Sequence, residues 1–410
     1  MTVGIVAEYD PFHRGHLYQM RQAREKTGAE YVVVVLGGDF LQRGMPSLVD
    51  KRARARMAVD AGADLVLALP YIYSVNSARE YALGAVRILA GTGCVEAISF
   101  GCETDDPEQL NSAASIMSRE GELSPLIREQ LSRGLSFPEA MTRSVEQLGG
   151  RETVEILRKP NNLLACEYLR ACRETGASLT PVPVRRLQST ASGTSGEPYL
   201  SASEIRQHIR TQGVLAALPC VPESTANVLR DTFPETDMPA RFRDVDRRMF
   251  TLLKYRLLTA DRQELKRICL AGEGLENRLK AAVTKESVQT VSALADEVKT
   301  RRYTRARIMR ILTHVLMDFR EEDFQWLRGA GCARVLAFSD RGRTLLKKMR
   351  KTSSVPVLSN LARPDRYDAR IRRILELEIR AAGLYRMLHG DSDLTGGEIR
   401  YVPYGAQKGT

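Results

Sequence analysis

Two histidines near the start of the chain, His13 and His16, flank Gly15 and follow an apolar run that ends in Asp10-Pro11. A buried strand, this turn and a following helix would place both imidazoles and backbone N–H groups where phosphates bind in open α/β sheets. Transfer at an α-phosphate gathers negative charge on a five-coordinate phosphorus, which such donors stabilise, and Gly15 lets the backbone approach closely. The motif predicts a nucleotide site. The simpler alternative is a pair of turn histidines with structural hydrogen bonds, and two histidines are too few ligands to predict a metal site.

A second candidate motif is S-A-S-E-I-R at 201–206. Its hydroxyls and helix N–H groups could form a second phosphate clamp, with Arg206 neutralising the leaving β,γ-phosphates. The ordinary alternative is an N-capped helix with Glu204 in its first turn. The preceding segment, 188–198, is rich in Ser, Thr and Gly, which predicts a mobile loop suited to act as a lid.

Three further positions are weaker candidates. Asn161-Asn162 could cap a helix, or one amide could hold the adenine or ribose. Arg185-Arg186 at a strand end could be surface charge or could meet the nucleotide. Gly101 closes a predicted strand at a point where a side chain would obstruct the base.

The elements that must position these residues predict an α/β fold with a parallel sheet covered by helices on both faces. Strands are expected at 2–7, 31–36, 64–69, 95–100 and 181–187, and helices between them at 16–26, 51–61, 78–90 and 163–174. A polar helical insertion or cover is expected at 106–148. After about residue 213 the pattern becomes mostly amphipathic helix, at 244–284, 287–320 and 366–388, with one clear strand at 333–338. We therefore predict two domains, 1–213 and a mainly helical 214–410.

Composition limits the class of protein. The 410 residues are 43 % apolar and 27 % charged, typical of a globular chain, and no run of 18 apolar residues predicts a membrane span. The absence of a basic leader with a cleavage site favours a cytoplasmic protein. The seven cysteines are scattered without a C-x-x-C pair, which indicates reduced thiols and makes a zinc site unexpected.

The net charge of +11 favours a polyanionic partner such as RNA, although a merely basic protein remains the alternative. The run at 299–310 has six basic residues and no acid, and 341–351 carries six more. Such runs are often only solvated helix faces, but clusters around an aromatic side chain favour phosphate contacts. The candidate RNA-binding residues are Lys299, Arg301, Arg302, Tyr303, Arg305 and Arg307.

At this point the motifs resemble a known family. The E-Y-D-P-F-H-R-G-H stretch at 8–16 resembles the H-x-G-H nucleotidyltransferase superfamily, whose N-terminal domain is Rossmann-like. The G-D-F-L-Q-R-G stretch at 38–44 and the K-T-R-R-Y-T-R block at 299–305 are similar to one family within it, the tRNA(Met) cytidine acetate ligases. The segments at 160–162, 167–169, 201–206, 334–338, 353–356 and 378–381 keep that family's order, so the resemblance spans essentially the whole chain.

The resemblance implies an enzyme that activates acetate with ATP, forms acetyl-adenylate and releases pyrophosphate. It then passes the acetyl group to N4 of the wobble cytidine of elongator tRNA(Met), giving N4-acetylcytidine. Carried over by position, the catalytic residues would be His13, His16, Ser203 and Arg206. The ATP-binding residues would be Val6, Ala7, Glu8, Tyr9, Asp10, Pro11, Phe12, His13, Arg14, Gly15, His16, Leu17, Tyr18, Gln19, Gly101, Asn161 or Asn162, and Arg185 or Arg186.

Two residues depart from the family pattern, because Asp10 and Asp39 stand where asparagine is expected. A carboxylate beside a polyphosphate must bind Mg²⁺ or be paired, and Mg²⁺ is the expected companion of ATP. Two other functions remain open: a small-molecule adenylyltransferase, which would not need a basic helical half, and a non-catalytic nucleotide-sensing RNA-binding protein. No nucleophilic triad is evident, so we assign no general base and expect direct transfer from adenylate to amine.

Overall fold

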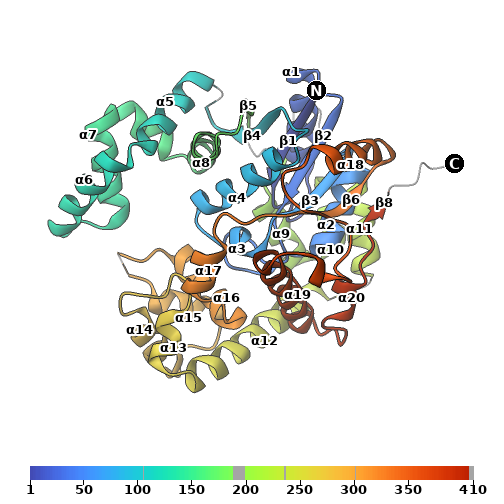
Figure 1. Ribbon diagram of the computed structural model, residues 1–410. Helices are drawn as coiled ribbons and strands as arrows, with labels where there is room; N and C mark the ends of the chain where they lie inside the picture. Colours follow the sequence, from blue (N-terminus) through green and yellow to red (C-terminus); the bar gives the residue numbers. More distant parts are fainter. Residues whose placement is uncertain (105, 188–198, 235–236, 301, 406–410) are drawn as a thin grey trace.

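The computed structural model describes residues 1–104, 106–187, 199–234, 237–300 and 302–405 (Figure 1). The predicted loop at 188–198 therefore lies outside the described residues. Five parallel strands form the centre of one sheet: β1 (Thr2–Ala7), β2 (Tyr31–Leu36), β3 (Leu65–Ala68), β4 (Ala97–Cys102) and β5 (Thr180–Arg185). The strand order is β5-β4-β1-β2-β3-β6-β7, so β1 lies centrally, with Ile5 paired to Val34 on one side and to Ser99 on the other. The predicted α/β fold class is confirmed.

Both faces of the sheet are buried, as expected for β-branched strands between helices. Val32 and Val34 of β2 pack in one core with α1 (Arg14–Thr27) and α2 (Lys51–Asp60), whereas Val33 and Val35 pack in the other. That second core contains α4 (Ala78–Gly91), α8 (Pro160–Thr175) and the short α3 (Tyr71–Ser74). Because β1 is central and followed by α1, the turn between them lies at the carboxyl edge of the sheet.

The second half of the chain also contributes to this sheet. The predicted strand at 333–338 is β6 (Ala333–Phe338), which pairs antiparallel with β3 and so departs from the all-parallel expectation. Strands β7 (Val357–Leu358) and β8 (Tyr404–Gly405) pair parallel with β6. The sheet therefore takes strands from both sides of residue 213, and the division at 213 stays a prediction about function.

The expected insertion is an arm of three helices, α5 (Pro107–Ser118), α6 (Glu120–Ser132) and α7 (Phe137–Leu157). It has a small core of its own around Leu123, Val145 and Val154. Figure 1 shows the arm extending sideways from α8, beyond the sheet. Its first helix also covers the sheet core, because Leu110, Ala113, Ala114 and Met117 of α5 are buried there, whereas α6 and α7 extend outward.

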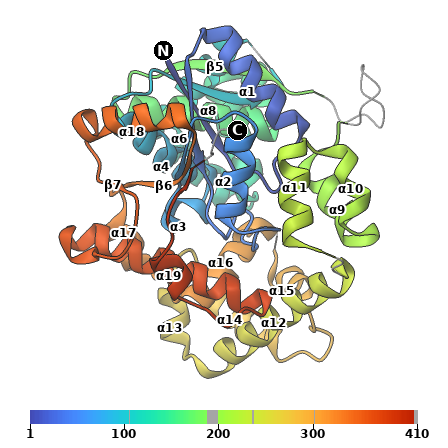
Figure 2. The same ribbon diagram turned by 90° about the vertical axis from the view of Figure 1, so that its right-hand side faces the viewer.

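The remaining helices are α9 (Ala202–Gln212), α10 (Val214–Ala217), α11 (Glu223–Thr232), α12 (Met238–Thr259), α13 (Arg262–Arg267), α14 (Leu275–Val283), α15 (Val291–Val298), α16 (Arg305–Met317), α17 (Glu321–Leu327), α18 (Asp340–Thr352), α19 (Ala369–His389) and α20 (Gly396–Ile399), with 3-10 turns at Leu218–Cys220 and Pro364–Arg366. Of these helices, α12–α17 and α19 gather below the carboxyl edge of the sheet in Figures 1 and 2. Helices α9–α11 lie beside the sheet, with α11 next to α2, and α18 lies beside β6. The long amphipathic segments predicted at 244–284 and 287–320 are thus each broken into shorter helices. Within the described ranges, no helix is both long and apolar enough to cross a membrane.

A buried ion cluster holds α2 against the C-terminal helices. The Lys51 ammonium lies 3.0 Å from Asp39, 3.3 Å from Glu378 of α19 and 2.8 Å from Glu398 of α20. Lys51 and all three of these acids are buried. Asp39, one of the two unexpected acids, is therefore neutralised in the protein interior and does not face a phosphate site.

Candidate active site

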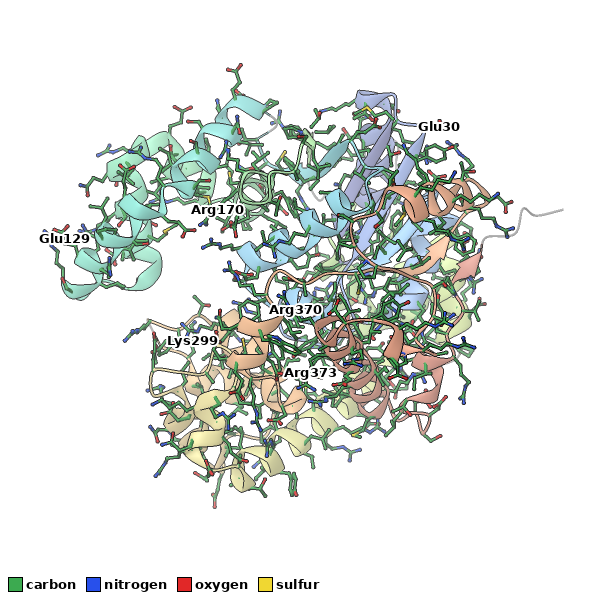
Figure 3. The ribbon with its side chains drawn as sticks, in the orientation of Figure 1. Glu30, Glu129, Arg170, Lys299, Arg370 and Arg373 are labelled. Atoms are coloured by element: carbon green, nitrogen blue, oxygen red, sulfur yellow. The ribbon has the colours of Figure 1, made fainter. Side chains whose placement is uncertain are left out.

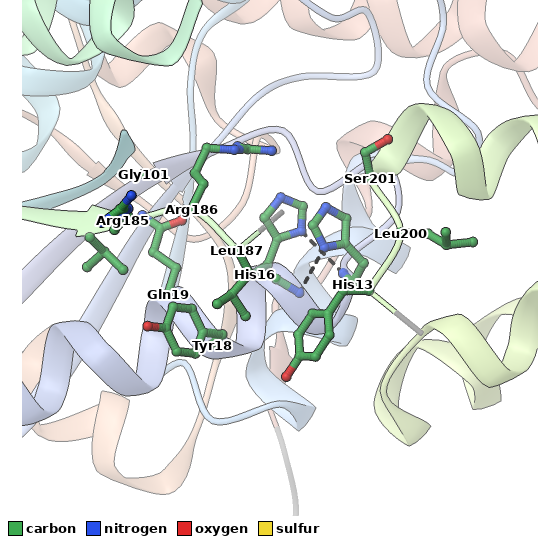
Figure 4. A pocket seen from close by; sticks show the side chains of 13 residues that line it. His13, His16, Tyr18, Gln19, Gly101, Arg185, Arg186, Leu187, Leu200 and Ser201 are labelled. Atoms are coloured by element: carbon green, nitrogen blue, oxygen red, sulfur yellow. Dashed lines mark hydrogen bonds between the residues drawn. The ribbon is translucent and has the colours of Figure 1, made fainter. Parts of the chain in front are cut away.

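The β1–α1 turn fixes both motif histidines by backbone hydrogen bonds. His13 caps α1, because its Nδ1 accepts from the backbone N–H of Gly15 at 3.1 Å, and His16 Nδ1 accepts from the backbone N–H of His13 at 3.2 Å (Figure 4). The two rings are stacked, with centroids 3.6 Å apart and an interplanar angle of 22°. A neutral imidazole whose Nδ1 accepts carries its proton on Nε2. Both Nε2 atoms are therefore N–H donors.

Burial keeps both imidazoles neutral. It lowers the pKa of His13 to about 3, with help from the positive charges of Arg186 and Arg206. The pKa of His16 also lies well below its ordinary value, because of burial, His13 and Arg186. At neutral pH the pair therefore offers two uncharged hydrogen-bond donors in a positive surrounding, which suits the oxygens of a phosphate.

These histidines line a pocket at the carboxyl edge of the sheet (Figure 4). A Cβ on Gly15 would lie 2.9 Å from His13 Cε1, and one on Gly101 would lie 3.3 Å from Arg186 Cγ, so both glycines leave space for the side chains that form the walls. The predicted residues that the structure brings together here are His13, Gly15, His16, Tyr18, Gln19, Gly101, Arg185 and Arg186, with Ser201 of the second motif. Val184, Leu187, Tyr199 and Leu200 complete the lining and were not predicted.

Most other predicted residues of the first motif lie behind the pocket. Tyr9 and Phe12 are buried, with ring centroids 4.7 Å apart, and support the turn. Arg14 points away, donating to the carbonyl oxygen of Pro219 at 3.2 Å. The residues that do not line the pocket are Val6, Ala7, Glu8, Tyr9, Asp10, Pro11, Phe12, Arg14 and Leu17.

The two asparagines have different places. Asn162 is fully buried, and its Oδ1 accepts from the backbone N–H groups of Glu103 and Thr104 at 2.9 and 3.0 Å. It therefore holds the loop after β4 and is turned away from the pocket. Asn161 accepts from Arg186 at 3.2 Å, which orients one pocket arginine. Neither asparagine lines the pocket.

Arg206 meets the first motif from α9. Its guanidinium donates to the carbonyl oxygen of Asp10 at 2.6 Å and lies 3.4 Å from the Asp10 carboxylate, which also pairs with Arg43. The backbone N–H of Leu48 donates to the same carboxylate at 2.6 Å. Burial alone would raise the pKa of Asp10, but Arg43 and Arg206 outweigh it and the pKa is lowered. The charge of Asp10 is therefore paired, and Arg206 and Ser203 line a neighbouring cavity instead of this pocket.

The G-D-F-L-Q-R-G stretch joins the sheet to the C-terminal helices. The backbone N–H of Gln42 donates to Glu8 at 2.7 Å, and the Gln42 carbonyl accepts from Arg310 of α16 at 3.3 Å. The hydroxyl of Thr313 donates to the Gly44 carbonyl at 2.9 Å. This loop therefore connects the active-site turn with α16.

The basic run at 299–310 is less free than its sequence predicts. Arg302 lies 3.3 Å from Glu273, Arg305 lies 2.9 Å from Asp296, and Arg307 donates to the Leu270 carbonyl at 3.1 Å. Tyr303 is only 5 % exposed, because its hydroxyl donates to Glu273 at 2.7 Å within the fold, so its ring is a support and not an exposed stacking surface. Arg301 lies outside the described residues. Lys299 is exposed on the side that faces the arm carrying Glu129 (Figure 3).

Three comparisons with known proteins agree. The family model HIGH Nucleotidyl Transferase matches residues 1–396. The tRNA(Met) cytidine acetate ligase of Thermoanaerobacter sp. (strain X514) is 32 % identical over 404 residues, covering 96 % of this chain and 97 % of the relative. That of Acetivibrio thermocellus is 34 % identical over 405 residues, covering 95 % of each chain. The crystal structure of Thermotoga maritima TmcAL bound with alpha-thio ATP matches with a TM-score of 0.86 at 28 % identity, covering 98 % of this chain and 99 % of that one. The chain belongs to the tRNA(Met) cytidine acetate ligase family.

Proposed function

We propose that this chain is an ATP-dependent ligase that activates acetate as acetyl-adenylate and acetylates N4 of the wobble cytidine of elongator tRNA(Met). One observation carries the proposal: two neutral imidazoles, each with its Nδ1 occupied by a backbone N–H, present Nε2–H donors to a pocket flanked by Arg185 and Arg186. That arrangement is suited to bind a nucleoside triphosphate by its phosphates and to stabilise charge that grows at the α-phosphorus.

In the first step, an acetate oxygen attacks the α-phosphorus and forms an acyl–phosphate bond. The bond from the α-phosphorus to the bridging oxygen breaks, and pyrophosphate leaves with that oxygen. The donors His13 and His16 would stabilise the five-coordinate phosphorus, and Arg186 would neutralise its added charge. In the second step, the cytidine N4 attacks the acetyl carbonyl carbon, AMP leaves, and N4 loses a proton to solvent.

Mg²⁺ is the expected companion of ATP, but the nearby acids do not fit a metal site. Asp10 is paired with two arginines, and Glu8 pairs with Arg43 at 3.7 Å and accepts from the Gln42 N–H. Among the residues that the structure describes, no group of three or more His, Cys, Asp or Glu side chains is placed to hold a metal ion. We therefore propose that Mg²⁺ enters on the phosphates of ATP, whose charge it reduces.

The basic residues Lys299 and Arg302 are our candidates for contacts to the RNA backbone, since both are exposed. The double variant Lys299→Gln, Arg302→Gln should weaken tRNA binding and reduce the slope of log K against log salt by about 0.7–0.9 for each phosphate that is no longer neutralised. Arg151→Gln on the arm is the control, because that side chain is 92 % exposed and lies on a different element. Undiminished affinity in the double variant would place the RNA surface elsewhere. A tRNA substrate also favours the predicted cytoplasmic location.

The activity itself is tested with ATP, carbon-labelled acetate and a tRNA(Met) transcript, followed by digestion of the RNA to nucleosides. We expect labelled N4-acetylcytidine, together with AMP and pyrophosphate, and no label in a transcript whose wobble cytidine is replaced by uridine. An adenylated small molecule other than acetyl-adenylate, formed without RNA, would support a small-molecule adenylyltransferase. ATP binding without turnover would support a nucleotide-sensing RNA-binding protein.

A further inference from the structure

A second cavity, of about 400 Å³, lies next to the candidate active site. Its walls are the loop after β2, helices α9 and α12, and single residues of α16 and α19. The first turn of α9 borders both spaces, because Ser201 lines the pocket and Ser203 lines the cavity. Arg206 lines the cavity and still influences the pKa of His13, so the cavity lies within electrostatic reach of the reacting phosphate.

The cavity is strongly cationic. Five arginines line it: Arg43, Arg206, Arg210, Arg241 and Arg305. Asp246 is the one acid among its lining residues. Three of the arginines are already ion-paired, Arg43 and Arg206 with Asp10 and Arg305 with Asp296.

The other two arginines have a different environment. Arg210 lies over the ring of Phe242 at 4.7 Å, and Arg241 lies over the ring of Phe233 at 5.0 Å. Within the described part of the chain, neither forms an ion pair with a carboxylate at 4.0 Å or less. Arg210 acts electrostatically on Asp246, because its charge opposes the rise that burial causes in the pKa of Asp246. Arg210 and Arg241 are therefore available to bind an anion from outside the protein.

The same cavity has an apolar side, formed by Met45, Pro46, Leu48, Met238, Phe242, Val245 and Met249. Pyrophosphate or another small anion would gain nothing from contact with this apolar surface. An unstacked nucleotide fits both sides of the cavity, because its phosphates pair with arginines and its base packs on aromatic and apolar side chains. The volume also falls in the usual range for a small-molecule site.

We propose that this cavity binds the acceptor nucleotide, an unstacked pyrimidine nucleotide within an RNA strand. Arg210 and Arg241 bind the phosphates on either side of it, and Phe242 and its apolar neighbours contact the base. The exocyclic amine then reaches the acetyl-adenylate past the first turn of α9, where Ser201 lines the pocket and Ser203 lines the cavity. This assignment rests on the proposed function, because only a transfer to RNA requires a nucleotide beside the adenylate.

Arg241→Gln tests the assignment, with Arg247→Gln as its matched control. Both residues lie on α12, but Arg247 is 73 % exposed and lines neither space. Two reactions are measured: acetate-dependent exchange of pyrophosphate into ATP, which reports adenylate formation, and acetylation of tRNA. For Arg241→Gln we expect exchange within twofold of the unaltered chain and kcat/KM for tRNA lower by about 10- to 100-fold, the fold-change for losing a charged hydrogen bond. Arg247→Gln should leave both the exchange reaction and the acetylation of tRNA unchanged.

Two results would overturn the assignment. Unchanged kcat/KM for tRNA in Arg241→Gln would mean that the cavity does not bind the acceptor. An equal loss of exchange and transfer would assign the cavity to the ATP site. If the unaltered chain performs exchange but forms no N4-acetylcytidine, the proposed function fails by itself.

A second measurement does not depend on activity. A tRNA carrying 5-iodocytidine at the wobble position is irradiated in complex with the chain, and the cross-linked peptide is identified by mass spectrometry. We expect the peptide that contains Phe242. Cross-links confined to peptides away from α9, α12 and the loop after β2, or no cross-link, would contradict the assignment.

Discussion

The Asp10 carboxylate and the Arg206 guanidinium lie 3.4 Å apart, although 196 positions separate the two residues in the sequence. Asp10 belongs to the first candidate motif and Arg206 to the second, so this ion pair joins the two motifs into one structure. With Arg43 on the other side, it also explains how an acid is accommodated beside a phosphate site. Arg206 of this pair also lines the cavity that we assign to the acceptor nucleotide.

We predict that Asp10→Asn destabilises the fold by about 2 kcal/mol, because Arg206 loses its carboxylate partner while Arg43 keeps Glu8, and both arginines are partly exposed. The surface variant Asp231→Asn, whose carboxylate is 63 % exposed and pairs with Arg56, should cost less than about 1 kcal/mol. Urea unfolding monitored by circular dichroism measures both. Equal effects of the two variants would show that the Asp10 pairs are not needed for stability.

His13→Ala and His16→Ala should each reduce acetate-dependent pyrophosphate exchange by about 10²–10³-fold, the effect of removing one donor to a developing anion. His13→Asn separates this role from helix capping, because asparagine is a good N-cap but lacks the Nε2–H donor. We expect it to retain stability and still lose activity. His208→Ala on α9, which lines neither space, is the control. Full activity of His13→Asn would show that His13 acts only as the N-cap of α1.

The pH dependence follows from the lowered pKa of His13, about 3, against an ordinary value of 6.5. The free enzyme keeps His13 neutral at pH 6. As the pH is lowered, kcat/KM for pyrophosphate exchange should therefore not fall with a midpoint near pH 6.5. Between about pH 3 and 6.5 the unfolded chain binds more protons at His13 than the folded chain does. His13 therefore lowers the stability of the fold as the pH falls below 6.5. Proton NMR of the His13 ring, assigned by comparison with His13→Ala, measures the midpoint. A value near 6.5 would contradict the buried, neutral donor.

Gly44→Ala should destabilise the protein by more than about 2 kcal/mol. Its φ is 72°, and an added Cβ would lie 2.4 Å from the carbonyl carbon of Met309, a collision with helix backbone that cannot move aside. Gly28→Ala is the control, because its φ is 63° but no atom lies within 4 Å of an added Cβ. The control should cost about 1 kcal/mol from backbone strain alone. Equal losses of stability in Gly44→Ala and Gly28→Ala would show that contact with α16 does not exclude a side chain at residue 44.

Much of the fold was predictable because strand and helix periodicities are local properties of the sequence. Buried β-branched runs indicated the central strands, and Ser201 does cap α9 by accepting from Glu204. The antiparallel pairing of β6 with β3 was not predictable, because no local pattern specifies a partner strand more than 260 positions away. Turns such as the one after Thr259 also break helices where amphipathic periodicity continues.

The site was predictable in its chemistry but not in its charge pairing. The spacing of His13 and His16 indicates two donors, yet only the structure shows that each Nδ1 accepts from a backbone N–H, which leaves the ring proton on Nε2. Asn162 looked like a ligand-binding amide, but its Oδ1 is used by two backbone N–H groups. Tyr199 and Leu200 directly precede the S-A-S-E-I-R motif, and that adjacency was the signal that could have placed them in the pocket.

The central claim is that acetate attacks the α-phosphorus of ATP beside His13 and His16. The most direct measurement supplies acetate labelled with ¹⁸O in both oxygens, together with ATP and tRNA(Met), and analyses the phosphates by mass spectrometry. An acyl-adenylate requires one ¹⁸O to leave with AMP after acetyl transfer, and pyrophosphate to remain unlabelled. Formation of ADP with ¹⁸O in inorganic phosphate would show attack at the γ-phosphorus and would contradict the account.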